Sequence, residues 1–160
     1  MTKKQPSLVV ETLQTVGLSI VLAFGIRQFV AEARVVPTGS MQPTVEINDR
    51  LVIEKISYRF HPPQRGDIIV FQAPQKALEA AGSTTKDAYL KRVVGLPGET
   101  IEVRDGKVYV NDQALTENYI KTPPLYTWGP RIVPDSHYLV LGDNRNGSSD
   151  GHVWGFLPEE

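Results

Sequence analysis

The sequence contains no cysteine and only three histidines among its 160 residues. The absence of cysteine excludes disulfide bonds, thiolate metal sites and a cysteine nucleophile. The three histidines, His61, His137 and His152, do not have the spacing of zinc ligands, such as an i, i+4 pair on a helix. We therefore predict neither a metal site nor a cofactor.

The sequence also lacks an excess of charge of either sign. Acidic and basic residues number 18 and 17, and no long run of one sign occurs. The electrostatic footprint of a nucleic-acid-binding protein is therefore missing, and we predict no nucleic-acid partner. The length suits one domain of ordinary size, and the sequence carries no signal for an oligomeric state.

One long stretch near the N-terminus is free of charge. Lys3 and Lys4 precede residues 12–26, which contain no charged side chain. A membrane-spanning helix needs about 20 mostly apolar residues, so the stretch must extend toward Glu11 and Arg27, which can snorkel. We predict that residues 1–33 hold a cytoplasmic N-terminus and a membrane anchor, because basic residues favour the cytoplasmic side. Residues 34–160 are then extracytoplasmic.

Two other interpretations of this stretch stay open. A secretory signal peptide has a basic start, an apolar run and a small-residue cleavage site, which Ala31-Glu32-Ala33 supplies. An amphipathic helix packed on a soluble core is the second alternative. It is disfavoured because Ser19 is the only polar residue between Val16 and Ile26, so no polar face exists.

The rest of the sequence is typical of β structure. Short apolar runs at 51–56, 68–71 and 137–141 are bounded by turn residues and predict strands. Residues 101–110 predict a hairpin, because Asp105-Gly106 accepts the positive φ angles of a type I′ turn. One helical turn is expected at 76–80, and Trp128-Gly129-Pro130 is interpreted as a loop. The predicted fold is mostly β, an antiparallel β-sheet catalytic domain preceded by a single N-terminal transmembrane helix.

Ser40 and Lys91 are candidates for a nucleophile and its base. A serine needs a neighbouring base, and histidine is the usual one, but the Gly-x-Ser-x-Gly elbow is missing. A lysine can serve if burial lowers its pKa from ~10.4 by roughly 3 units. Lys91 lies in the apolar run 89–94, which suits this purpose. Lys55 is less suitable, because the adjacent Glu54 favours its charged form.

Four segments together resemble the successive motifs of type I signal peptidases. They occur in that family's order, and with the preceding apolar stretch they cover almost the whole chain. The segments are Gly39-Ser40-Met41-Gln42-Pro43-Thr44, Arg65-Gly66-Asp67-Ile68-Ile69-Val70-Phe71, Lys91-Arg92-Val93-Val94-Gly95-Leu96-Pro97-Gly98-Glu99 and Gly142-Asp143-Asn144-Arg145-Asn146-Gly147-Ser148-Ser149-Asp150.

The resemblance implies roles for individual residues. Ser40 matches the acylating nucleophile and Lys91 its general base. The oxyanion hole would combine the backbone N–H of Ser40 with the hydroxyl of Thr38. Ser148 matches a serine that orients the lysine.

A second group of matched residues would support the geometry of the loops. Asp150 matches a carboxylate that braces its loop through an ion pair, but the usual arginine partner is replaced by His152. The resemblance assigns the remaining supporting positions to Arg92, Asp143 and Arg145.

The substrates implied by the resemblance are exported preproteins bearing signal peptides, cut after small residues in an Ala-X-Ala-like pattern. The substrate segment would bind as an added β-strand in apolar pockets. Such an enzyme works at a lipid bilayer, here the cell membrane, with a thylakoid membrane as the alternative. The residues expected to line the pockets are Val36, Pro37, Met41, Val45 and Leu90.

Two rival functions stay open at this point. A self-cleaving repressor-type protease also uses serine and lysine on a β scaffold, although it would carry a DNA-binding module in place of the apolar stretch. A secreted, non-catalytic β domain could retain the motifs. The resemblance also implies a final family strand after Glu160, which the sequence does not contain.

Overall fold

The computed structural model describes residues 7–85 and 87–159. Within this part, the chain forms two compact units. The first comprises the described residues up to Arg34 together with Leu51–His61, and the second comprises Val35–Arg50 and the described residues from Pro62 onward. Lys3 and Lys4, on which the predicted orientation depends, lie outside the described residues.

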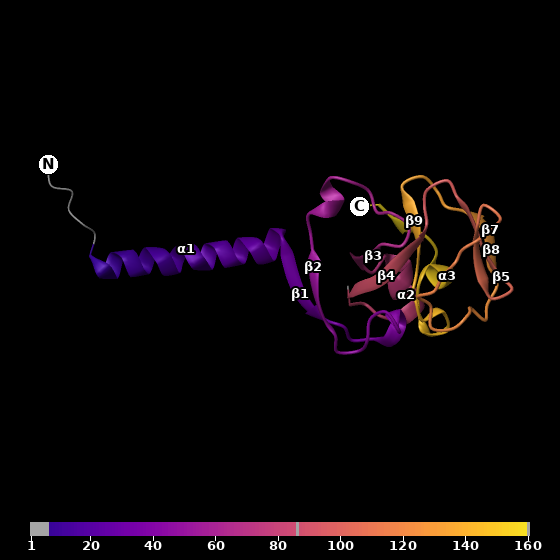
Figure 1. The fold of residues 1–160 in the computed structure, drawn as a ribbon, viewed down its shortest axis with the longest axis horizontal. Helices are drawn as coiled ribbons and strands as arrows, with labels where there is room; N and C mark the ends of the chain where they lie inside the picture. Colours follow the sequence, from indigo (N-terminus) through magenta and orange to yellow (C-terminus); the bar gives the residue numbers. More distant parts are fainter. Residues whose placement is uncertain (1–6, 86, 160) are drawn as a thin grey trace. The chain divides into compact units, whose positions relative to one another are not determined.

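Helix α1 (Leu8–Phe29) dominates the first unit (Figure 1). Its 22 residues span about 33 Å at the usual rise of an α-helix. By length and composition it can cross a membrane. Glu11 lies in its first turn and Arg27 in its last, the arrangement that the helix dipole favours. None of its residues is buried, so the structure gives no support to the interpretation as a soluble core helix.

A two-stranded ribbon follows the helix. Strand β1 (Ala31–Val35) pairs with β2 (Arg50–Glu54), and a short 3₁₀ helix, η2 (Ser57–Arg59), comes next. The backbone N–H of Lys55 donates to the carbonyl of Val30 at 2.9 Å, just after the helix ends. The strand predicted at 51–56 is confirmed as β2, although it ends at Glu54.

The second unit contains an antiparallel sheet of four strands. Strands β3 (Ile68–Gln72) and β9 (His137–Leu141) match the strands predicted at 68–71 and 137–141, and β4 (Ala88–Gly95) contains the apolar run 89–94. Successive residues of β4 and β9 point to opposite faces of the sheet, as in any strand. Val93 and Val140 pack in one core cluster, whereas Val94 and Leu139 pack in another. The strands, in sheet order, are β10 (Leu157–Pro158), β9 (His137–Leu141), β4 (Ala88–Gly95) and β3 (Ile68–Gln72).

Two short helices complete the first core cluster. Helix α2 (Gln75–Ala81) contains the predicted helical turn and buries Ala77 and Leu78. Helix α3 (Gly151–Trp154) contributes Trp154, which is 5% exposed. Figure 1 shows both helices near the sheet that carries β4.

A second antiparallel sheet covers the other core cluster. The predicted hairpin is confirmed, because Asp105 and Gly106 have φ angles of 50° and 70°, both in the region that a type I′ turn requires. Ile101, Val103 and Val108 are essentially fully buried. The strands, in sheet order, are β7 (Gln113–Ala114), β6 (Lys107–Val110), β5 (Thr100–Arg104) and β8 (Trp128–Ile132).

The interpretation of Trp128-Gly129-Pro130 as a loop is wrong, because these residues begin β8. β8 is an edge strand, where proline is tolerated, and its register with β5 shifts between Ile101 and Val103. A Cβ at Gly129 would lie 2.5 Å from the carbonyl oxygen of Ile101, so glycine permits the close approach. Trp128 packs in the second core cluster.

Candidate active site

Ser40 lies in a short 3₁₀ helix, η1 (Gly39–Met41), that is anchored on both sides. Met41 is 1% exposed and holds the turn in the interior. Asn144 holds the turn from the other side: its backbone N–H donates to the carbonyl of Ser40 and its side-chain amide to that of Gly39, each at 3.0 Å. Half-buried Ser40 is therefore held at a defined position.

Lys91 comes from β4 and reaches Ser40. Its Nζ lies 2.9 Å from Ser40 Oγ and donates to the carbonyl of Leu90 at 3.0 Å. The ring of Tyr89 lies beneath it, with its centroid 5.3 Å from Nζ. The side chain is long enough to cross from the strand to the nucleophile, and only 4% of Lys91 is exposed. The structure thus brings together the two residues that the sequence proposed as nucleophile and base.

The surroundings of Lys91 favour its neutral form. Burial lowers the pKa of Lys91, and the charge of Asp150 opposes this shift without overcoming it. Among the described residues, no carboxylate forms an ion pair with Lys91. In the neutral form the amine has a lone pair, so the Ser40 hydroxyl can donate its proton across the 2.9 Å contact.

The two other residues expected at the reacting centre differ in what they contact. Thr38 Oγ1 lies 3.4 Å from Ser40 Oγ, next to the nucleophile. Ser148 Oγ is buried and makes no hydrogen bond within the described residues, so the expected bond to Lys91 is not formed. A Cβ at Gly142 would lie 2.3 Å from Ser148 Oγ and 2.5 Å from the carbonyl oxygen of Ser40. Gly142 is therefore required for the loop to approach the nucleophile, and the roles of Thr38 and Ser148 stay predictions.

Asp150 and His152 form a pair, with Nδ1 of His152 2.7 Å from Oδ1 of Asp150. Asp150 is fully buried, accepts from the backbone N–H of Gly142 at 2.8 Å, and caps α3 by accepting from that of His152. The His152 ring stacks on Tyr126, with centroids 4.0 Å apart. Histidine thus occupies the partner position that the resemblance gave to arginine, and keeps a contact with the carboxylate.

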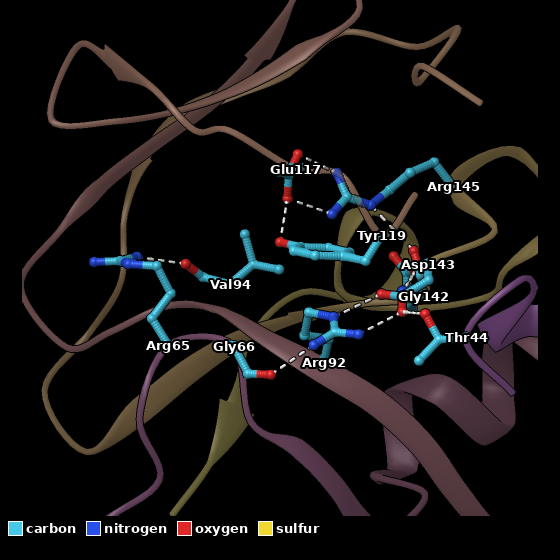
Figure 2. Close-up of polar contacts among 11 residues, drawn as sticks. Thr44, Arg65, Gly66, Arg92, Val94, Glu117, Tyr119, Gly142, Asp143 and Arg145 are labelled. Atoms are coloured by element: carbon cyan, nitrogen blue, oxygen red, sulfur yellow. Dashed lines mark hydrogen bonds and ion pairs between the residues drawn. The ribbon is translucent and has the colours of Figure 1, made fainter. Parts of the chain in front are cut away.

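Asp143 and Arg145, which follow Gly142 in the same loop, belong to a buried ionic cluster (Figure 2). Asp143 accepts two hydrogen bonds from Arg92, at 2.8 and 2.7 Å, and one from the Thr44 hydroxyl. Arg145 is paired with Glu117 in the same bidentate manner, at 2.9 and 2.6 Å. Bidentate pairs of this kind fix orientation as well as charge.

The sequence reasoning missed Thr44 as a support, and Glu117 and Tyr119 entirely. One signal was available. Among the supporting positions, Asp150 was matched to His152, which leaves Asp143 as the single acid for the two arginines Arg92 and Arg145. Two buried guanidinium groups each need a carboxylate, so a second acid was to be expected outside the motifs.

The residues expected to bind substrate are mostly interior. Val36, Met41 and Val45 are 7%, 1% and 7% exposed, Leu90 is half-buried and Pro37 is exposed. Their contact with a substrate stays a prediction. No group of three or more histidine, aspartate or glutamate side chains in residues 7–85 and 87–159 could hold a metal ion.

Comparison with known proteins decides the family. A family model described as "Signal peptidase, peptidase S26" matches residues 9–160. The chain belongs to the signal peptidase family, peptidase S26. It is 57% identical to "Signal peptidase I" of Leptolyngbya laminosa over 157 residues, 98% of this chain and 77% of the relative. The resemblance seen in the sequence is confirmed.

Other members of the signal peptidase family extend the comparison. "Probable signal peptidase I-2" of Synechocystis is 56% identical, over 92% of this chain and 66% of the relative. "Thylakoidal processing peptidase 1, chloroplastic" of Arabidopsis thaliana is 41% identical, over 89% and 42%. A crystal structure of a signal peptidase I from Enterococcus faecalis V583 is 32% identical, covers 62% of this chain and 92% of its own, and has a TM-score of 0.47.

Membership in this family makes the chain a serine endopeptidase. The two rival functions, a self-cleaving repressor-type protease and a non-catalytic β domain, are not favoured.

Proposed function

We propose that the chain removes signal peptides from exported preproteins, with Ser40 as nucleophile and neutral Lys91 as general base. One observation carries the proposal: the Nζ atom of a lysine that is 4% exposed lies 2.9 Å from the hydroxyl of Ser40. A buried lysine without a carboxylate partner is the kind of group that can accept a proton near neutral pH.

The chemistry is acyl transfer in two steps. Lys91 accepts the hydroxyl proton while Ser40 Oγ attacks the scissile carbonyl carbon. The oxyanion that forms is stabilised by the N–H of Ser40 and the hydroxyl of Thr38. The Lys91 ammonium then gives its proton to the amine of the departing mature protein, which leaves the signal peptide esterified to Ser40. Water, deprotonated by Lys91, hydrolyses the ester and releases the signal peptide with a free carboxylate.

The supporting residues keep these two groups aligned. Asp150 holds Gly142 through its backbone N–H, while Arg92, Asp143 and Arg145 hold the neighbouring loop. Ser148 lies beside Gly142 and, on this proposal, orients Lys91 during the reaction.

Cleavage after small residues requires shallow apolar pockets beside Ser40. Their proposed lining comes from the two segments that carry the reacting groups, so the substrate strand would lie along both. The proposed lining residues are Val36, Pro37, Met41, Val45 and Leu90.

We also propose that α1 anchors the enzyme, with residues 1–33 as cytoplasmic terminus and anchor and the catalytic domain on the extracytoplasmic face. The length and apolar surface of α1 support this. Ala33 lies inside β1, which pairs with β2, so removal of the segment as a signal peptide would cut a paired strand. Relatives named signal peptidase and thylakoidal processing peptidase support a cell or a thylakoid membrane.

The test is cleavage of a preprotein by purified full-length enzyme in detergent micelles. Ser40→Ala and Lys91→Ala should each abolish processing, whereas full activity of either variant would refute the dyad. The cleaved product should begin directly after an Ala-X-Ala segment by mass spectrometry. Membrane fractionation together with intact mass tests the anchor, since a mature form starting at Arg34 would contradict it.

A further inference from the structure

Two side chains between β7 and β8 have no part in the proposed chemistry, yet both lie against arginines of the site. The carboxylate of Glu117 accepts hydrogen bonds from both terminal nitrogens of Arg145, and the Tyr119 hydroxyl donates to it at 2.8 Å. The ring of Tyr119 covers Arg92, with Cζ 4.0 Å from the ring centroid. Figure 2 shows the four side chains, in which Arg145 contacts Glu117, Glu117 contacts Tyr119, and Tyr119 contacts Arg92. We call Glu117 and Tyr119 together the Glu117–Tyr119 clamp.

The carboxylate of Glu117 is buried and accepts all three of these hydrogen bonds, and Tyr119 is half-buried. The side chains of Arg145 and Glu117 are 1% and 4% exposed. Burial raises the pKa of Tyr119, so its hydroxyl is a neutral donor at physiological pH. Stability alone explains such an arrangement poorly, because the desolvation of a buried ion pair offsets most of its attraction. A fixed geometry is the better explanation.

Arg145, which Glu117 holds, contacts the loop that packs against the nucleophile. Nε of Arg145 donates to the carbonyl of Gly142 at 3.1 Å. Gly142 lies against Ser40, since a Cβ at position 142 would be 2.5 Å from the Ser40 carbonyl oxygen. The next residue but one, Asn144, donates its backbone N–H to that same oxygen. A shift of Arg145 would therefore move the loop on which the nucleophile rests.

Tyr119 contacts Arg92, the neighbour of the base in the chain. Arg92 follows Lys91 directly in β4 and is held between the ring of Tyr119 and the carboxylate of Asp143. The backbone N–H of Lys121, two residues beyond Tyr119, donates to the carbonyl of Asp143 at 3.1 Å. One short segment of chain thus contacts the supports of both reacting groups.

We infer that the Glu117–Tyr119 clamp is a positioning device that sets the separation of Ser40 Oγ and Lys91 Nζ, acting through Arg145 and Arg92. The inference rests on the proposed function, because it assumes that these two atoms exchange a proton. It predicts that damage to the clamp lowers kcat and leaves KM nearly unchanged, since neither clamp residue contacts the expected substrate-binding residues in the hydrogen bonds and ring contacts described.

The chain contains a matched control. On β5 and β6, Arg104 bonds to Glu102 at 2.8 Å and lies over the ring of Tyr109, with Cζ 3.9 Å from the centroid. Glutamate, tyrosine and arginine therefore meet here as they do where the clamp meets its arginine partners, but the side chain of Arg104 is 40% exposed and lies outside the site. Glu102→Gln and Tyr109→Phe therefore make the same chemical changes as Glu117→Gln and Tyr119→Phe at a place without a catalytic role.

The experiment compares these four variants with wild type in the full-length enzyme. For each one, kcat and KM are measured on a preprotein, and the rate is divided by the folded fraction from near-ultraviolet circular dichroism. Glu117→Gln should lower kcat about 10–100-fold, because sub-ångström to ångström misplacement of reacting groups costs this much. Tyr119→Phe keeps the ring on Arg92 and should lower kcat only about 2–5-fold. Both control variants should stay within about twofold.

The inference is overturned if the clamp variants, corrected for folding, have the wild-type kcat, or if their loss lies in KM. A merely structural role would lower the melting temperature and the folded fraction without changing kcat per folded molecule. Should Glu117→Gln fail to fold, Tyr119→Phe decides in the same way: an unchanged kcat rejects the clamp. Failure of the proposed function is a separate result, in which wild type does not process preproteins or Ser40→Ala does.

Discussion

Lys91 and Lys55 have similar sequence surroundings and opposite environments. Each has an apolar neighbour in the sequence, Leu90 before Lys91 and Ile56 after Lys55, but Lys91 is 4% exposed and contacts a hydroxyl and a carbonyl. The side chain of Lys55 is 30% exposed, pairs with Glu32 at 2.8 Å and donates to the carbonyl of Arg27. The environment in the folded protein, and not the neighbours in sequence, therefore decides which lysine can be a base.

Glu54, the acid next to Lys55 in the sequence, is engaged elsewhere in the structure. Glu54 does not pair with Lys55; its carboxylate accepts backbone N–H groups of Ser57 and Ile56. These hydrogen bonds, that from Ser57 first, lower the pKa of Glu54. Glu32 supplies the negative charge instead, and the hydrogen bond from Lys55 lowers the pKa of Glu32.

The largest expected effect comes from replacing each lysine by arginine. Arginine stays protonated at all accessible pH values and cannot act as a base. Lys91→Arg should therefore lower kcat by about 10²–10⁴-fold. Lys55→Arg keeps an ion-pairing cation and should stay within about twofold of wild type. Preprotein cleavage by the two variants measures the difference, and comparable losses would remove the distinction between the lysines.

A smaller effect is expected from Asp150→Asn, which should lower the pKa of Lys91 still further below that of an ordinary lysine. The charge of Asp150 raises the pKa of Lys91 against the effect of burial. Without it, the acid limb of kcat/KM should move to lower pH. The maximal rate should fall about tenfold, because one carboxylate hydrogen bond in the brace is lost. A limb that stays in place, or moves to higher pH, would show that Asp150 does not act on Lys91 electrostatically.

Stability should change in the opposite direction to activity at Lys91. Because its pKa is lowered in the folded state, the charged form is penalised by folding, and this penalty is full below the folded pKa. Lys91→Met should be inactive but stabilised by about 0.5–2 kcal/mol at neutral pH. The advantage should shrink as the pH approaches the ordinary lysine value of ~10.4. Urea unfolding at several pH values measures it, and a destabilised variant would argue that Lys91 supports the fold.

The smallest effect belongs to the ion pair of the other lysine. Glu32→Gln should leave kcat and KM within about twofold of wild type, because exposed ion pairs contribute little. The same preprotein assay serves as the check. A large loss would mean that the ribbon of β1 and β2 takes part in the reaction.

The strands that were predicted correctly have local signals. The apolar run 68–71 follows Gly66-Asp67, the run 137–141 ends at Gly142-Asp143, and Asp105-Gly106 specifies its own turn. β1 was not predicted, because Ala31–Val35 contains two charged residues and none of the five side chains is buried. Its strand conformation comes from pairing with β2, which the local sequence does not encode. β8 was missed because its Gly-Pro pair is tolerated only at a sheet edge.

The site residues also comprise some that local sequence could predict and some that it could not. Ser40 and Lys91 could be proposed from motifs, because the chemistry demands those residue types in recognisable surroundings. Glu117 could not be placed, because its partner Arg145 is 28 residues away and only the folded chain brings them together. The contact of Ser148 with Lys91, taken from the resemblance, is not formed in the structure and stays a prediction.

The most direct test of the account is the pKa of Lys91 in the folded enzyme. Selective ¹⁵N labelling of lysine, with Lys91→Met to assign the signal, allows the Nζ resonance to be titrated beside the pH profile of kcat/KM. If neutral Lys91 is the general base, Lys91 titrates well below the ordinary value of ~10.4, and the acid limb of the profile has the same midpoint. A Lys91 that titrates at or above that value in an active enzyme would contradict this role.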